Sequence, residues 1–125
     1  MVKYVMVGIG GFAGSIARYW LGSYIGEKVG TRFPYGTFVI NISGSFLIGL
    51  IMSLLAEKMR WNPNWIYLVP IGFIGAYTTF STFEYETLRT VQDGQFLTAF
   101  LNITLSVVTG FVAVWAGAAA GRAMP

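Results

Sequence analysis

A small set of polar side chains lies inside long apolar stretches of this chain, and these residues are the ones best placed to do chemistry. Amide and hydroxyl groups can replace the water around an ion without reacting with it. The chain has no histidine and no cysteine, and its acidic residues cluster near the ends of the apolar stretches. We therefore expect no enzyme active site, and the pattern indicates an ion pathway. The candidate residues are Arg18, Thr37, Asn41, Asn102 and Ser106.

The sign of the ion follows from two of these side chains. A charge such as Arg18 inside a membrane span costs about 2.5–3.5 kcal/mol, so it should face protein, water or an anion. The amide of Asn41 offers two N–H donors. The apolar stretches 4–25, 35–56 and 96–119 contain no carboxylate, which argues against a cation. Two alternatives stay open: Arg18 reaches the membrane surface, or Asn41 only joins two helices.

Two phenylalanines strengthen the case for an anion. Phe80 and Phe83 are three residues apart and so share one face of a helix. The edge of an aromatic ring is electropositive and can contact an anion that has lost its water. The alternative is that both rings only face lipid or the protein core.

Composition places the chain among membrane proteins. Hydrophobic residues make up 55% of its 125 residues and charged residues only 10%. Four apolar segments, at 4–25, 35–56, 65–88 and 96–119, are each long enough to cross a bilayer. We expect a single all-α transmembrane domain over residues 1–125, in contact with the lipid bilayer.

The third segment contains a stretch that does not favour a continuous helix, GFIGAYTTFSTF at residues 72–83. Gly72 and Gly75 weaken a helix interior, and Pro70 just before them removes a backbone hydrogen bond. The hydroxyls that follow compete for backbone partners. We expect a broken third helix near the membrane midplane, where irregular backbone must be enclosed by protein or line a wet cavity.

Basic residues are spread evenly between the two sides of such a protein. One side carries Lys3, Lys58, Arg60 and Arg122, and the other carries Lys28, Arg32 and Arg89, or four residues if Arg18 is counted. Orientation in a membrane follows asymmetry in lysine and arginine, so this balance predicts insertion both ways and an antiparallel homodimer. A fixed orientation remains the alternative. No basic tract suggests a nucleic acid partner.

Three motifs resemble the CrcB/Fluc family of fluoride channels: GGFAGSIARYW (10–20), GTFVINISGSFLIG (36–49) and GFIGAYTTFSTFE (72–84). The resemblance implies a dual-topology homodimer with two antiparallel pores that let fluoride leave the cytoplasm through the inner membrane of a prokaryote. It makes Phe80, Phe83 and Asn41 pore residues and adds Ser81 and Thr82 to the polar wall. It also implies a structural sodium ion, bound by the main-chain carbonyls of Gly75 and Thr78 at the dimer interface.

The resemblance further matches Arg18 to the arginine of the family's first span and Glu86 to an acidic vestibule position. Some family members carry a tyrosine where this chain has Asn102 and a serine where it has Gly110. The polar stripe of the last span is therefore taken from this chain's own residues, namely Asn102, Ser106 and Thr109.

Two other protein classes share the small size and the four spans. An exporter of organic cations needs a carboxylate in the first span, where this chain has Arg18 and no acid. A membrane assembly subunit without transport activity would explain the glycines that allow close helix packing. It would not explain the hydroxyl stripe or the interrupted third span.

Overall fold

The computed structural model describes residues 1–57 and 62–125, and its regular elements there are all helical. The helices are α1 (Val2–Val29), α2 (Tyr35–Glu57), the π-helix η1 (Tyr67–Ile74), α3 (Gly75–Tyr77), α4 (Phe80–Gln92) and α5 (Phe96–Ala123). The expected all-α class is confirmed. Lys58 and Arg60, which the count of basic residues uses, lie outside the described residues.

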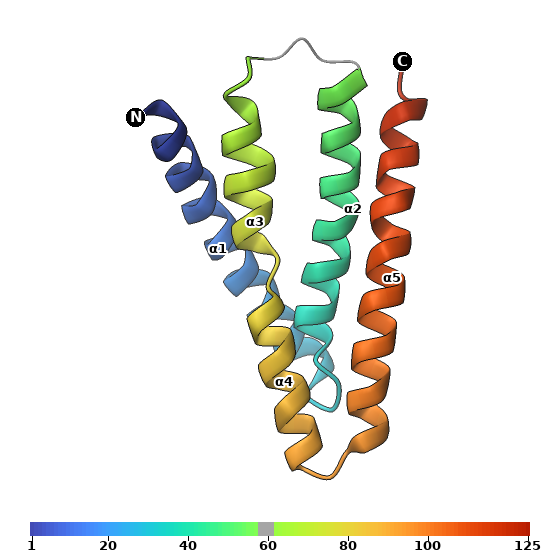
Figure 1. Cartoon of the computed structure of the whole chain (residues 1–125). Coiled ribbons are helices and arrows are strands. Elements are labelled where there is room, and N and C mark those ends of the chain that lie inside the picture. The colour runs from blue at the N-terminus through green and yellow to red at the C-terminus, as the bar shows by residue number, and fades with distance from the viewer. Residues whose placement is uncertain (58–61) are drawn as a thin grey trace.

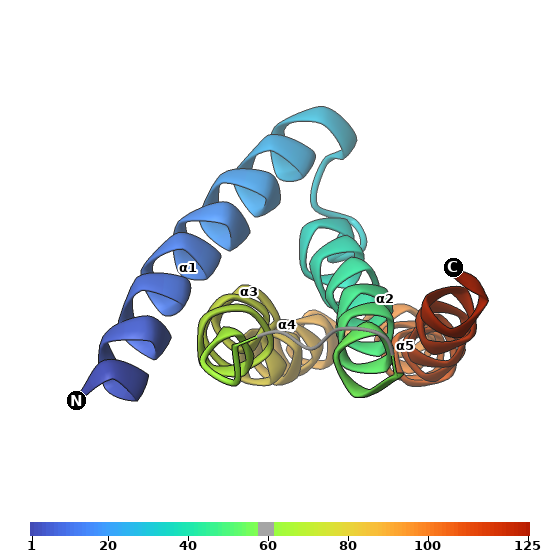
Figure 2. The ribbon, with the colours of Figure 1, turned by 90° about the horizontal axis from the view of Figure 1, so that it is seen from above.

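The chain runs back and forth along one axis, so both termini lie at the same end of the bundle (Figure 1). The turn between α4 and α5 lies at the opposite end. Seen from above, α2 and α5 lie side by side, whereas α1 slopes away from them along its length (Figure 2).

Local sequence explains where the helices end. Gly30, with φ of 83°, follows α1, and Gly94, with φ of 74°, lies between α4 and α5. Glycine adopts this left-handed conformation without the penalty that a side chain brings. Proline at position 34 comes directly before α2, where a missing backbone N–H removes no helical hydrogen bond.

The interruption between α3 and α4 falls on two threonines. Pro70, Gly72 and Gly75 all lie in helical backbone, and the wider π-helix accommodates the proline. Thr78 (φ −77°, ψ 156°) and Thr79 (φ −149°, ψ 119°) are extended. The departure from helix therefore lies at the hydroxyl residues of the 72–83 stretch, after its proline and glycines.

Glycines bring two pairs of helices into backbone contact. A Cβ atom at Gly10 or Gly14 of α1 would overlap the carbonyl oxygens of Leu68 or Phe73 in η1. In the same way, Gly49 of α2 and Gly117 of α5 each face the partner helix's backbone. These glycines let the helices approach more closely than larger residues would allow.

Two helices are long and apolar enough to cross a membrane by length and composition. They are Tyr35–Ala56, with mean hydropathy 2.1, and Phe96–Ala123, with mean hydropathy 2.0. Only 22% and 17% of their most apolar windows are buried, unlike the core helices of a soluble protein. The first predicted span contains Arg18 and many glycines, and the third is divided among three short helices. For these two, the membrane crossing stays a prediction.

Candidate functional site

The extended segment between α3 and α4 is held in place by one side chain from α2. Asn41 Nδ2 donates to the Thr79 carbonyl at 2.9 Å, and the Thr79 N–H donates to Asn41 Oδ1 at 2.8 Å. The Thr79 hydroxyl in turn accepts from the Thr82 N–H at 3.3 Å and so caps α4. Because its backbone groups find these partners, Thr79 can leave the helix while it is buried.

The same interruption releases two main-chain carbonyls from helical hydrogen bonding. In a continuous helix, the Thr79 N–H would bond to Gly75 and the Thr82 N–H to Thr78. Here these two N–H groups go to Asn41 and to the Thr79 hydroxyl. The carbonyl oxygens of Gly75 and Thr78 thus lose their helical donors, and such oxygens are ligands that a hard cation prefers.

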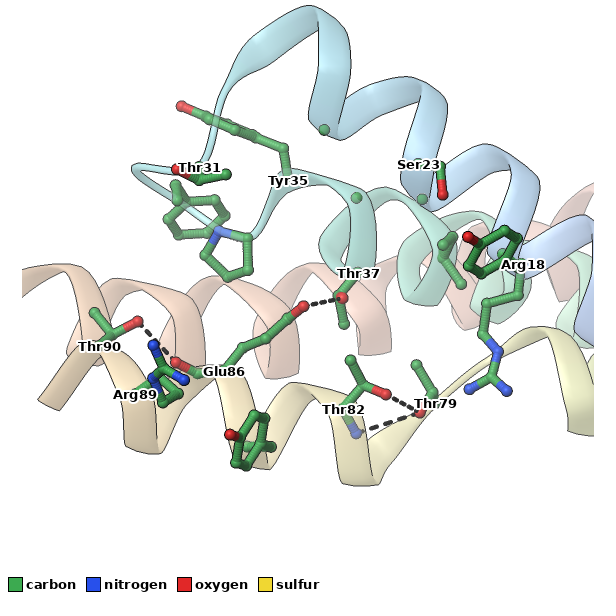
Figure 3. A pocket seen from close by; sticks show the side chains of 18 of the residues that line it. Arg18, Ser23, Thr31, Tyr35, Thr37, Thr79, Thr82, Glu86, Arg89 and Thr90 are labelled. Carbon is green, nitrogen blue, oxygen red and sulfur yellow. Dashed lines mark hydrogen bonds between the residues drawn. The ribbon is translucent and has the colours of Figure 1, made fainter. Parts of the chain in front are cut away.

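Thr79 lines two separate cavities. The larger, of about 760 Å³, lies between α1, α2 and α4 and contains Arg18, Thr37 and Thr82 (Figure 3). The smaller, of about 400 Å³, contains Asn41, Phe80, Phe83 and Ser106, together with Gly75 and Thr78. Most of the predicted site residues therefore gather around one threonine, but in two groups.

The larger cavity holds charges of both signs. Arg18 is half-buried and extends into it, and the carboxylate of Glu86 lies on the α4 side. The Thr37 hydroxyl donates to Glu86 Oε1 at 2.8 Å (Figure 3). Glu86 Oε2 is buried and has no hydrogen-bond partner among the described residues. A cavity lined by arginine and threonine can attract a hydrated anion, and Glu86 opposes this attraction unless its charge is balanced.

The two phenylalanines lie in different surroundings. Their ring centroids are 5.8 Å apart with an interplanar angle of 43°. Phe83 is only 7% exposed, whereas Phe80 is 73% exposed and Ser81 is exposed beside it. Both phenylalanines line the smaller cavity, together with Asn41.

Asn102 lies deeper than the sequence suggests. Its side chain is 1% exposed and does not line either of the two cavities. Its Nδ2 donates to the Thr87 hydroxyl at 2.9 Å, and Ser106 donates to its Oδ1 at 3.3 Å. Only Ser106 of this pair reaches the smaller cavity.

Sequence reasoning missed two residues of the site, Thr79 and Thr87. Thr79 is one of several hydroxyls in the run TTFST, and nothing in the run singles it out. Thr87 lies four residues after Phe83 and therefore on the same face of a helix, and this spacing could have identified it from the sequence.

Comparisons with known proteins identify the family to which the chain belongs. Residues 5–118 match the family described as CrcB-like protein, Camphor Resistance (CrcB). The chain is 54% identical to a protein of Acidobacterium capsulatum named fluoride-specific ion channel FluC, over 97% of both chains. Proteins of the same name from Solibacter usitatus and a Sulfurihydrogenibium species are 48% and 42% identical, each over at least 97% of both chains. This chain, as its three motifs indicate, belongs to the CrcB family.

Proposed function

We propose that this protein is a fluoride-selective channel that lets fluoride leave the cytoplasm passively and so confers fluoride resistance. The observation that carries the proposal is that Thr79 lines both cavities and is bonded to the Asn41 amide, which lines the smaller cavity together with the two phenylalanines. The names of the relatives supply the identity of the ion. The protein has no catalytic step to perform, and lipid surrounds its apolar outer face in a bacterial inner membrane.

The proposed path begins at Arg18 in the larger cavity, where a hydrated fluoride ion enters. Thr37, Ser81 and Thr82 form a polar wall, and Asn41 with Ser106 continues it. The edges of Phe80 and Phe83 then contact the ion where water is scarce. Each contact is weak alone, which suits conduction because an ion bound too tightly would not leave.

A second copy of the chain completes the path. Phe80 is 73% exposed although it lines the smaller cavity, so this face offers a large aromatic surface to a partner. An antiparallel homodimer would cover this face and form two pores. Because the chain has no cysteine, a single cysteine placed at exposed Gln95 reports orientation. We expect an impermeant thiol reagent to label about half of the molecules in whole cells, whereas one fixed orientation gives all or none.

A sodium ion at the dimer interface is supported by the freed carbonyls of Gly75 and Thr78. Its role would be structural, since main-chain oxygens from a broken helix suit a hard cation. The Na⁺ ion takes no part in the fluoride path.

The decisive experiment is efflux from liposomes that contain the purified protein. One set is loaded with fluoride and read with a fluoride electrode, and a matched set is loaded with chloride. We expect rapid loss of fluoride and little loss of chloride. A folded dimer that releases neither ion, or both at equal rates, contradicts the proposal.

A further inference from the structure

The most deeply buried large side chain among the described residues is polar. Asn102 of α5 is 1% exposed, and its amide lies in a chain of four groups that reaches from one helix to the other. Ser106 bonds to Asn102, Asn102 bonds to Thr87, and the Thr87 hydroxyl donates to the Phe83 carbonyl at 2.8 Å. The chain of hydrogen bonds thus ends at a residue that lines the smaller cavity.

The direction of these hydrogen bonds is fixed at the Phe83 end. A carbonyl oxygen can only accept, so the single hydroxyl proton of Thr87 is used there. The Thr87 oxygen must then accept from its other neighbour, which sets Asn102 Nδ2 toward Thr87 and Oδ1 toward Ser106. The Asn102 amide therefore has one defined orientation. A buried polar network whose hydrogen bonds are satisfied in this way makes the surrounding structure rigid.

Helix α4 is held to its neighbours at three places. Asn41 holds its cap residue Thr79, and Thr37 holds Glu86, both from α2. On the α5 side, the bond from Asn102 to Thr87 is the side-chain hydrogen bond that joins the two helices in the described part of the chain. Loss of this bond would leave α4 without a side-chain hydrogen bond to α5 in the described part of the chain, so that packing alone would hold the Phe83 turn on that side.

We propose that Asn102 is a positioning residue, which acts through Thr87 to fix Phe83 at the wall of the smaller cavity and does not touch the permeating ion. This inference rests on the proposed function for its effect on flux, but its structural part can be measured separately. The proposal gives Asn102 a different role from Ser106, which lies one turn further along α5 and lines the smaller cavity.

The test combines three substitutions with two measurements. Asn102→Ala and Thr87→Val each remove the joining bond, and Thr87→Ser keeps the hydroxyl. Fluoride efflux is measured in liposomes, and ¹⁹F NMR is recorded from 4-fluorophenylalanine inserted at position 83 alone. We expect Asn102→Ala and Thr87→Val each to lower efflux about five- to tenfold and to shift or broaden the ¹⁹F line, as loss of one buried hydrogen bond predicts.

The double variant identifies the route of action. If Asn102 acts through Thr87, Asn102→Ala with Thr87→Val is no worse than the more damaging single variant. Thr87→Ser should stay within about twofold of the parent protein because its hydroxyl is retained. Ser53→Ala is the matched control, since it removes another buried bond between α2 and α5, from Ser53 to the Ala118 carbonyl at 3.1 Å. It should leave efflux and the ¹⁹F line unchanged.

Two results would overturn the proposal. Additive losses of log efflux would mean that Asn102 acts independently of Thr87, and an unchanged ¹⁹F line in Asn102→Ala would mean that it does not position Phe83. If the parent protein releases no fluoride, the proposed function fails, and the ¹⁹F comparison still decides the positioning role. If Asn102→Ala does not fold, the comparison of Thr87→Val with Thr87→Ser decides it.

Discussion

The side chain of Asn41 pairs with both backbone groups of Thr79, as a neighbouring strand would. Its Nδ2 donates to the carbonyl at 2.9 Å, and its Oδ1 accepts from the N–H at 2.8 Å. A buried extended residue beside a helix would otherwise have unsatisfied polar groups. Asn41 thus stabilises the extended segment between α3 and α4 and also lines the smaller cavity.

These two hydrogen bonds predict the effect of Asn41→Asp. A carboxylate can still accept from the Thr79 N–H, but it cannot donate to the Thr79 carbonyl, and it adds a negative charge to the proposed anion path. We expect fluoride efflux to fall at least about tenfold and the protein to lose about 1–3 kcal/mol of stability. Liposome efflux and thermal unfolding in detergent measure the two effects.

Asn62→Asp is the matched control for that change. Among the described residues, the hydrogen bond of the Asn62 side chain is one that it accepts, from the Asn64 N–H at 3.0 Å, and aspartate preserves this role. It should conduct and unfold like the parent protein. If Asn41→Asp also conducts fluoride at the parent rate, Asn41 has no place in the pore.

Substitution of Phe80 by isoleucine separates ring chemistry from packing. The ring is 73% exposed in the single chain, so its loss should change the stability of the chain little. Because isoleucine lacks an electropositive edge, we expect fluoride efflux to fall about tenfold, which corresponds to about 1.4 kcal/mol. Efflux and thermal unfolding are measured on the same preparation.

The control is Phe12→Ile on α1, where the ring is 71% exposed and away from both cavities. It should leave efflux unchanged. Equal losses in the two variants would point to a general effect of surface aromatic residues and remove the reason for assigning Phe80 to the pore.

The sequence was sufficient for the helical class, and most of the site residues that it predicts line a cavity, because polar groups are rare in its apolar stretches. It did not distinguish Asn102, which is enclosed between helices, from Ser106, which reaches a cavity. Both lie on one face of α5, and only the position of α4 separates their surroundings. The pattern also put weight on Pro70 and the glycines, whereas the extended residues are Thr78 and Thr79, whose conformation depends on Asn41.

Close packing of α1 on η1 predicts a strong position dependence for alanine substitutions. A Cβ atom at Gly14 would overlap the backbone of Phe73, so Gly14→Ala should destabilise the protein by about 1–3 kcal/mol or more. At Gly8 nothing lies within 4 Å, and Gly8→Ala should be neutral or stabilising by up to about 1 kcal/mol. Thermal unfolding tests both variants, and equal midpoints would contradict the packing.

The carbonyls of Gly75 and Thr78 are open to a cation, because their helical donors bond elsewhere. If these oxygens bind sodium in the dimer, replacing sodium by N-methylglucamine at constant ionic strength should lower the thermal midpoint. Sodium at about a hundred times its dissociation constant would contribute about 2.7 kcal/mol. Addition of sodium should restore the midpoint, and the same concentration of N-methylglucamine should not. Identical unfolding curves with and without sodium would rule out a stabilising ion at these carbonyls and leave water as their partner.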